Sequence, residues 1–183
     1  MFHSSANFTL RPATLEEVPE LTSLIAESAR ALALADYSSE QIEAALEGAW
    51  GVDTQLIRDG TCFVAEAGGK RVGCGGWSFR RTLFGSDTHL AREPERLDAG
   101  NEPARIRAFF VHPGWARRGV GRALLGRCES EARRHGFKSA TLVATLPGVR
   151  FYRAHGYLGD QPGMHPLPRK LTIEFVPMRK QLD

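Results

Sequence analysis

The chain lacks the features that mark membrane-spanning, exported and repetitive proteins. No apolar run in its 183 residues approaches the roughly 18 residues that a membrane helix needs. The first eight residues show no basic region followed by an apolar one. Neither an internal repeat nor a low-complexity tract is present, which excludes the solenoid, collagen-like and disordered classes. We therefore expect one globular domain over residues 8–181, with no membrane partner.

Cysteine is scarce, with only Cys62, Cys74 and Cys128 in the chain. An odd number scattered through apolar stretches does not form a disulfide framework and suits small core residues in a reducing compartment. We therefore expect a cytoplasmic protein. No spacing among the six histidines is typical of a metal site, so no metal is expected.

Positive charge is concentrated in one stretch. Residues 105–155 contain ten arginines and Lys138 against two glutamates, a net charge of +9, while the rest of the chain carries −6. Such a block predicts a polyanionic partner: a nucleic acid, an anionic membrane or a phosphorylated cofactor. A solvated, arginine-rich helix face is the alternative. The stretch has no helix-turn-helix or zinc-finger spacing, so we expect no nucleic-acid partner.

Apolar periodicity and turn residues predict alternating strands and helices. Strands are expected over residues 8–12, 61–67, 71–79, 105–111, 138–144 and 171–175. Three glycines weaken or bend the strand over 71–79, and Pro177 favours a sheet edge for the strand over 171–175. Helices are expected from Thr14 to near Asp36, from Ser38 to Trp50, from about Val120 to His135, and from Pro147 to Gly156. Residues 80–103 are predicted to form a long polar loop that borders a substrate site.

Two glycines lie where the fourth predicted strand gives way to a helix, in Ala116-Arg117-Arg118-Gly119-Val120-Gly121-Arg122. The first N–H groups of a helix have no intrahelical partner, and glycine lets an anion approach them closely. The spacing excludes a P-loop, which needs Lys-Ser or Lys-Thr after the last glycine. It also excludes a dinucleotide fingerprint, because Leu124 stands where a third glycine is needed. A tight turn that needs glycine is the structural alternative.

This segment resembles the pyrophosphate loop of the GNAT superfamily of acyl-CoA-dependent N-acyltransferases, Gln/Arg-x-x-Gly-x-Gly/Ala. Ala116 stands at the first position in place of Gln or Arg. About thirty residues downstream, Phe151-Tyr152-Arg153-Ala154-His155-Gly156-Tyr157 is similar to the family's Tyr-x-x-x-Gly-aromatic segment. The resemblance implies a three-layer α/β fold with about four helices. Its sheet would be mixed, mostly antiparallel, six- to seven-stranded and splayed at the central strand.

The resemblance also implies acetyl-CoA as co-substrate and a set of residues that bind it. The pantetheine arm would be lined by the strand residues Phe109, Phe110 and Val111. The diphosphate would be held by the glycine segment, which comprises Ala116, Arg117, Arg118, Gly119, Val120, Gly121 and Arg122. Thr145 would stand where relatives often have Asn. A bulge in the strand would aim the Val111 N–H at the thioester carbonyl. Tyr152 is the expected hydrogen-bond or proton donor to the leaving thiolate.

The general base is harder to assign. Many family members have Glu early on the central strand, but Arg105 occupies that position and cannot accept a proton. Glu102 and Asp98 lie just upstream and are our candidate bases, with water as the alternative.

We expect transfer of an acetyl group to the primary amine of a small molecule or peptide by direct attack. A non-catalytic acyl-CoA-binding regulator is the second hypothesis, and a nucleic-acid-binding module is the third. The acidic remainder of the chain favours a cationic amine. Trp50, Trp77 and Tyr37 either line the acceptor pocket or, more simply, pack in the core. The sequence leaves a monomer and a homodimer both open.

Overall fold

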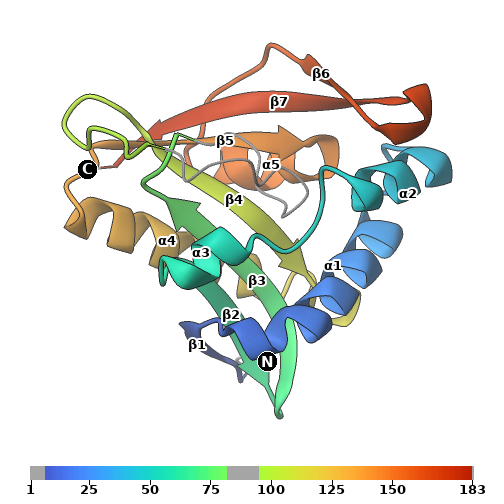
Figure 1. Ribbon diagram of the computed structural model, residues 1–183, viewed down its shortest axis with the longest axis horizontal. Coiled ribbons are helices and arrows are strands. Elements are labelled where there is room, and N and C mark those ends of the chain that lie inside the picture. Colours follow the sequence, from blue (N-terminus) through green and yellow to red (C-terminus); the bar gives the residue numbers. More distant parts are fainter. Residues whose placement is uncertain (1–6, 82–94, 183) are drawn as a thin grey trace, which may run out of the picture.

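The computed structural model describes residues 7–81 and 95–182, which are built around one sheet (Figure 1). The sheet has seven strands in the order β1-β2-β3-β4-β5-β7-β6. They are β1 (Thr9–Pro12), β2 (Cys62–Ala67), β3 (Lys70–Ser78), β4 (Ala104–Val111), β5 (Ser139–Thr145), β6 (Gly163–Pro166) and β7 (Thr172–Gln181). All neighbouring pairs are antiparallel except β4 and β5, which are parallel. The predicted mixed, mostly antiparallel sheet is therefore confirmed.

The parallel pair stays together at one end only. Ala104 pairs with Ala140 and Arg105 with Thr141, and beyond these positions β4 and β5 have no common register. β5 meanwhile pairs with β7 along its whole length. The sheet is thus open between the carboxyl ends of β4 and β5, which confirms the predicted splay at the central strand.

Helices cover both faces of the sheet and give three layers (Figure 1). They are α1 (Val18–Leu32), α2 (Ser39–Glu47), α3 (Thr54–Arg58), α4 (Val120–Arg134) and α5 (Leu146–Ala154). α1 and α3 share one apolar cluster with β2 and β3, whereas α4 shares another with β3, β4, β5 and α5. α3 was not predicted, because five residues are too few for a periodic pattern; Asp53 caps it by accepting a hydrogen bond from the Leu56 N–H at 3.2 Å. None of the described helices is long and apolar enough to cross a membrane.

Thr14 caps a 3-10 turn, Leu15–Glu17, that leads directly into α1, and Ser38 caps α2 at its predicted start. The Thr14 N–H donates to the Glu17 carboxylate at 2.9 Å, and the Gln41 N–H donates to Ser38 Oγ at 3.2 Å. The first two helices end earlier than predicted. α1 stops at Leu32 because the chain must turn before Ser38 caps the next helix, and α2 stops at Glu47 because Gly48 leaves helical geometry.

The glycines of β3 do not break the strand. A Cβ on Gly73 would lie 2.6 Å from Val120 Cγ1, and a Cβ on Gly75 would lie 2.8 Å from the Phe109 ring. Both positions therefore require glycine for space, since these distances are far below a normal van der Waals contact. The residues let α4 and the Phe109 side chain lie directly against the sheet.

The carboxyl-terminal part of the sheet differs from the prediction. β6 was not foreseen, and Pro177 lies on β7, between β5 and β6 in the sheet, so the predicted edge strand is wrong. β6 pairs only with residues Thr172 to Phe175, so the missing N–H of Pro177 costs no hydrogen bond to β6. Of the predicted loop 80–103, residues 82–94 lie outside the described residues. Its described ends are joined, because the Leu97 N–H donates to the Phe79 carbonyl at 2.7 Å.

Candidate active site

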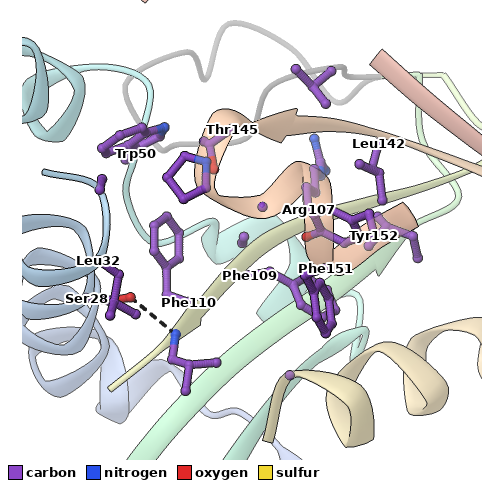
Figure 2. A pocket seen from close by; sticks show the side chains of 18 of the residues that line it. Ser28, Leu32, Trp50, Arg107, Phe109, Phe110, Leu142, Thr145, Phe151 and Tyr152 are labelled. Carbon is purple, nitrogen blue, oxygen red and sulfur yellow. Dashed lines mark hydrogen bonds between the residues drawn. The ribbon is translucent and has the colours of Figure 1, made fainter. Parts of the chain in front are cut away.

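The splay between β4 and β5 opens into a cavity of about 1190 Å³. The residues of β4 from Arg105 to Val111 form its floor, and the start of α4 and the residues of α5 line one side. Ser28 and Leu32 of α1 and Trp50, which follows α2, line the other side (Figure 2). The described residues of the 80–103 segment do not line this cavity.

The glycine segment turns the chain into α4 at the cavity wall. Arg117 and Gly119 have positive φ angles of 63° and 86°, and helical geometry begins at Val120. Ala123 is the first residue whose N–H bonds back to this end of the helix, to the Gly119 carbonyl at 3.0 Å. The N–H groups of the first turn therefore have no intrahelical partner. Six of the seven predicted residues line the cavity: Ala116, Arg117, Gly119, Val120, Gly121 and Arg122.

Arg118 is the exception. It does not line the cavity, and its guanidinium lies 5.3 Å from the centroid of the Trp115 ring, a cation–π contact. The charge of Arg118 is thus held at the edge of the segment rather than inside the cavity.

β4 contains the bulge that the sequence analysis expected. Arg107 pairs with Gly76 and Phe110 with Cys74, so Ala108 and Phe109 together face only Gly75. Ala108 has a φ of 59°, which is uncommon for a residue with a Cβ. Because of the bulge, Phe109 joins the cluster on the α4 face while Phe110 packs toward α1. Both rings still border the cavity (Figure 2).

The N–H of Val111 has a partner in the protein itself. It donates to Ser28 Oγ at 3.3 Å, and Ser28 is a buried residue of α1 that also lines the cavity (Figure 2). The neighbouring His112 N–H donates to the Val72 carbonyl on β3. Successive N–H groups along a strand point to opposite sides, so the Val111 N–H faces away from β3. A ligand carbonyl in this place would replace the Ser28 hydroxyl.

Tyr152 is buried within an aromatic group at the opposite wall. Its ring makes edge-on contacts with Phe109, Phe151 and Tyr157, with centroids 6.4, 5.0 and 5.7 Å away. Burial raises the pKa of its phenol well above the ordinary value, so the hydroxyl stays protonated at neutral pH. Thr145, which precedes α5, also lines the cavity.

The two sequence motifs meet at this wall. A Cβ on Gly121 would lie 3.3 Å from the Phe151 ring, so α5 packs directly against the first turn of α4. Unbonded helix N–H groups, arginine charge and a protonated phenol thus border a single cavity.

A family model described as the acetyltransferase (GNAT) family matches residues 21–157. The chain belongs to this family. Its match spans α1 to the end of the second motif and therefore includes every strand and helix that borders the splay except β6 and β7.

Solved structures of other GNAT proteins share the fold. A GCN5-related N-acetyltransferase from Rhodopseudomonas palustris is 22% identical, with a TM-score of 0.74 and full coverage of both chains. PaiA N-acetyltransferase from Thermoplasma acidophilum, in complex with coenzyme A, is 16% identical, with a TM-score of 0.65 over 96% of this chain and 99% of that one. Salmonella typhimurium yncA, with its cofactor acetyl-CoA, is 18% identical, with a TM-score of 0.60 over 96% and 94%. No curated protein matches the chain.

The two carboxylates predicted as bases in this GNAT protein do not line its cavity. Glu102 pairs with Arg81 at 2.7 Å and accepts a hydrogen bond from the Asp98 N–H at 2.8 Å. The Asp98 carboxylate accepts from the Gly100 N–H and from the Asn101 amide. Arg105, in contrast, lines the cavity. Sequence reasoning missed this outcome because it depends on side chains that meet across the fold.

Several cavity residues of this GNAT chain were not predicted. They include Ser28, Leu32, Arg107, Glu174 and His165. Trp50, which was assigned to either the pocket or the core, also lines the cavity. Trp77 and Tyr37 are core residues, 1% and 5% exposed. These five residues come from α1, β4, β6 and β7, and no local motif marks them, since only the packing of these elements brings them together.

The cysteines have structural surroundings, whereas His155 lines the cavity and also contacts the backbone of its own helix. Cys62, Cys74 and Cys128 are buried and free, and burial raises the pKa of the Cys74 thiol to about 12. His155 Nδ1 lies 2.8 Å from the Phe151 carbonyl at the end of α5. Among the described residues, no group of three or more His, Cys, Asp or Glu side chains is placed to hold a metal ion.

Proposed function

We propose that this GNAT protein transfers the acetyl group of acetyl-CoA to a primary amine by direct attack. The observation that carries the proposal is the convergence of the open first turn of α4, the β4 bulge and the buried Tyr152 on one cavity. Acetyl-CoA supplies an acetyl group already activated as a thioester. The chain's own residues have to hold it, polarise its carbonyl and manage two protons.

The start of α4 suits a diphosphate. The N–H groups of Val120, Gly121 and Arg122 lack intrahelical partners, and the partial positive charge of the helix start adds about 0.3 to 1 kcal/mol for an anion. Arg117 and Arg122 bring full charges to the same wall of the cavity. Gly119 has open space where its Cβ would be, so no side chain blocks the backbone there.

β4 provides a surface for the pantetheine arm and a donor for the carbonyl. Beyond Arg105 the strand has no β5 partner, so its backbone on that side is available to a ligand. The Val111 N–H faces this side, and its bond to Ser28 is exchanged for one to the thioester carbonyl when the ligand enters. A hydrogen bond there stabilises the negative charge that develops on oxygen during attack.

Two proton movements complete the reaction. A free alkylamine has a pKa near that of lysine, about 10.4, so it must lose a proton before it attacks. Neither predicted base, Glu102 or Asp98, lines the cavity, and we assign this proton to water, the alternative carrier. As the new C–N bond forms and the C–S bond breaks, the Tyr152 phenol donates a hydrogen bond or its proton to sulfur. In this proposal Tyr152 serves the leaving group, and water serves the amine.

Thermal stabilisation by acetyl-CoA tests the binding half of the proposal. We expect a concentration-dependent rise in melting temperature for the wild type and none for Gly121→Asp, which sets a carboxylate against the diphosphate. Gly126→Asp is the matched control, because Gly126 lies on an exposed part of the same helix with nothing within 4 Å of its would-be Cβ. Equal stabilisation of all three proteins would reject the site.

Coenzyme A release tests the catalytic half. We expect amine-dependent release, corrected for hydrolysis, with at least some members of a panel of primary amines. Stabilisation by acetyl-CoA with no amine-dependent release would instead support a non-catalytic acyl-CoA-binding regulator.

A further inference from the structure

The charged residues that line the cavity are mostly arginines. Within residues 7–81 and 95–182 there are five arginines, Arg105, Arg107, Arg117, Arg122 and Arg150, opposed by the single carboxylate of Glu174. Arg117 and Arg122 lie at the start of α4, where the diphosphate is proposed to bind, and Arg150 is an exposed residue of α5 beside it. Arg107 forms an ion pair with the buried Asp53 at 3.2 Å. Arg105 is left without an assigned partner.

Arg105 has a buried guanidinium nitrogen that makes no hydrogen bond. Its Nε is shielded from solvent and has no partner among the residues that the structure describes. The nearest acidic residue in the chain, Glu102, is bonded to Arg81 and to the Asp98 backbone instead. A buried donor without a partner costs about 1–3 kcal/mol, so the position is a poor choice for stability alone.

Arg105 lies on the face of β4 that looks away from α4. Ala104 and Ile106 belong to the core cluster on the α4 face, and side chains alternate along a strand, so Arg105 and Arg107 share the opposite face. Arg107 reaches Asp53 at the start of α3 on that face. Further along β4, Phe110 packs toward α1, and Leu32 and Trp50 complete an apolar wall (Figure 2).

We propose that Arg105 binds a carboxylate of the amine acceptor, and that the acceptor is an amino acid with an apolar side chain. This inference rests on the function proposed above. A guanidinium presents parallel N–H donors that match one planar carboxylate, and shielding from water strengthens the pair. A phosphate would call for more positive charge, as at the start of α4. The aromatic and aliphatic wall accounts for the apolar side chain.

Arg105 lies on the same strand as the bulge at Ala108 and the Val111 N–H, so an acceptor that contacts Arg105 and is acetylated would lie along β4. Burial also lowers the pKa of Arg105, because the charged form loses water, and a bound carboxylate would offset that loss.

The charged side chains that line the cavity are therefore mainly positive, although the chain outside residues 105–155 carries a net negative charge. The acidic remainder outside residues 105–155 favours a cationic acceptor, but of its carboxylates in the described residues only that of Glu174 lines the cavity. Charges outside the cavity are screened by water and salt, whereas Arg105 would contact the ligand directly.

Matched acceptors test the inference. Phenylalanine, phenethylamine and phenylalaninamide share the amine and the ring, but only the first carries a carboxylate. We expect kcat/KM for phenylalanine to exceed those of the other two by about tenfold to hundredfold, the effect of one hydrogen-bonded charge. Leucine and isopentylamine form a second pair. Equal or better use of the carboxylate-free amines, or no acetylation of either amino acid, would overturn the inference.

Variants of Arg105 locate the effect. Arg105→Gln should reduce the preference for the carboxylate to near one, chiefly through KM, and Arg105→Lys should keep part of it, because it keeps the charge but not the planar fork. Arg58→Gln, at an exposed residue of α3 outside the cavity, should keep the full preference. A preference that survives Arg105→Gln contradicts the assignment. Thermal stabilisation by acetyl-CoA is measured in parallel. If the carboxylate preference is missing but acetyl-CoA still stabilises the wild type, only the inference about Arg105 has failed. If acetyl-CoA does not stabilise the wild type, the proposed function has failed.

Discussion

Gly73 of β3 lies directly under Val120, the first residue of α4. A Cβ at position 73 would come within 2.6 Å of Val120 Cγ1 and within 3.3 Å of Leu124 Cδ1 and of the Phe110 carbonyl oxygen. The first turn of α4 therefore rests on the sheet through a position that has no side chain. The helix start that lines the cavity can lie this close to the sheet because a glycine forty-seven positions earlier in the chain leaves space for it.

Replacing this glycine should disturb both stability and cofactor binding. We expect Gly73→Ala to lower the free energy of unfolding by about 1–3 kcal/mol, because the core there has no room for a methyl group. Since Val120 must move, stabilisation by acetyl-CoA should also fall. Denaturant unfolding and thermal shift measure the two effects. Gly126→Ala, on the exposed side of α4, should be neutral or slightly stabilising. A Gly73→Ala variant as stable as the wild type, with full acetyl-CoA stabilisation, would contradict this packing.

Tyr152→Phe should separate catalysis from binding. The change removes the phenol but keeps the ring contacts with Phe109 and Phe151, so we expect kcat to fall by about a hundredfold or more with little change in acetyl-CoA affinity. Steady-state kinetics and a binding titration give the two values. Tyr157→Phe is the control, because Tyr157 is buried in the same aromatic group but does not line the cavity. Unchanged turnover in Tyr152→Phe would remove Tyr152 from the mechanism.

Ser28→Ala should weaken the free protein and strengthen its response to acetyl-CoA. The Val111 N–H loses its partner in the variant, which should cost about 1 kcal/mol of stability without ligand. In the variant, a thioester carbonyl can therefore accept a hydrogen bond from the Val111 N–H without first breaking a bond to Ser28. We therefore expect a larger rise in melting temperature with acetyl-CoA than in the wild type. A smaller rise would mean that the Ser28 hydroxyl itself contacts the ligand.

Glu17 should make stability depend on acid pH. Its carboxylate accepts hydrogen bonds from Arg11 at 2.7 and 2.9 Å and from Arg71 at 2.5 Å, and it also bonds to the Thr14 N–H. These bonds, those from Arg11 first, lower its pKa to about 2. A lowered folded-state pKa adds stability above the unfolded value near 4.3, at most about 3 kcal/mol here, and that stability is lost as the pH falls toward 2.

Unfolding in urea between pH 7 and pH 3 checks this linkage. Glu17→Gln should be less stable than the wild type at pH 7 and should lose less stability on acidification. Glu20→Gln is the control, because Glu20 is mostly exposed and also forms an ion pair with Arg71. Parallel pH profiles for the wild type and Glu17→Gln would show that Glu17 does not set the acid dependence.

Local sequence signals were sufficient for much of the fold. The alternation of apolar residues in β4, the four-residue spacing in α4 and the capping residues Thr14 and Ser38 each depend on neighbours a few positions away. α3 was missed because five residues do not show a helical period, and β6 was missed because its sequence begins with glycine and ends with proline, which disfavour a strand. The edge position predicted from Pro177 was wrong, because β6 covers only part of β7 and thereby tolerates a proline.

In the candidate site, too, some features follow from the local sequence and others only from tertiary packing. The sequence by itself determined a helix start with free N–H groups, since Gly119 and Gly121 act through the backbone next to them. Only the tertiary structure decided which side chains meet there: Glu102 turns to Arg81, Ser28 reaches Val111 from another helix, and Arg105 is left facing the cavity. Backbone conformation is set by near neighbours, whereas a side chain's partner is set by packing between elements that are distant in the chain.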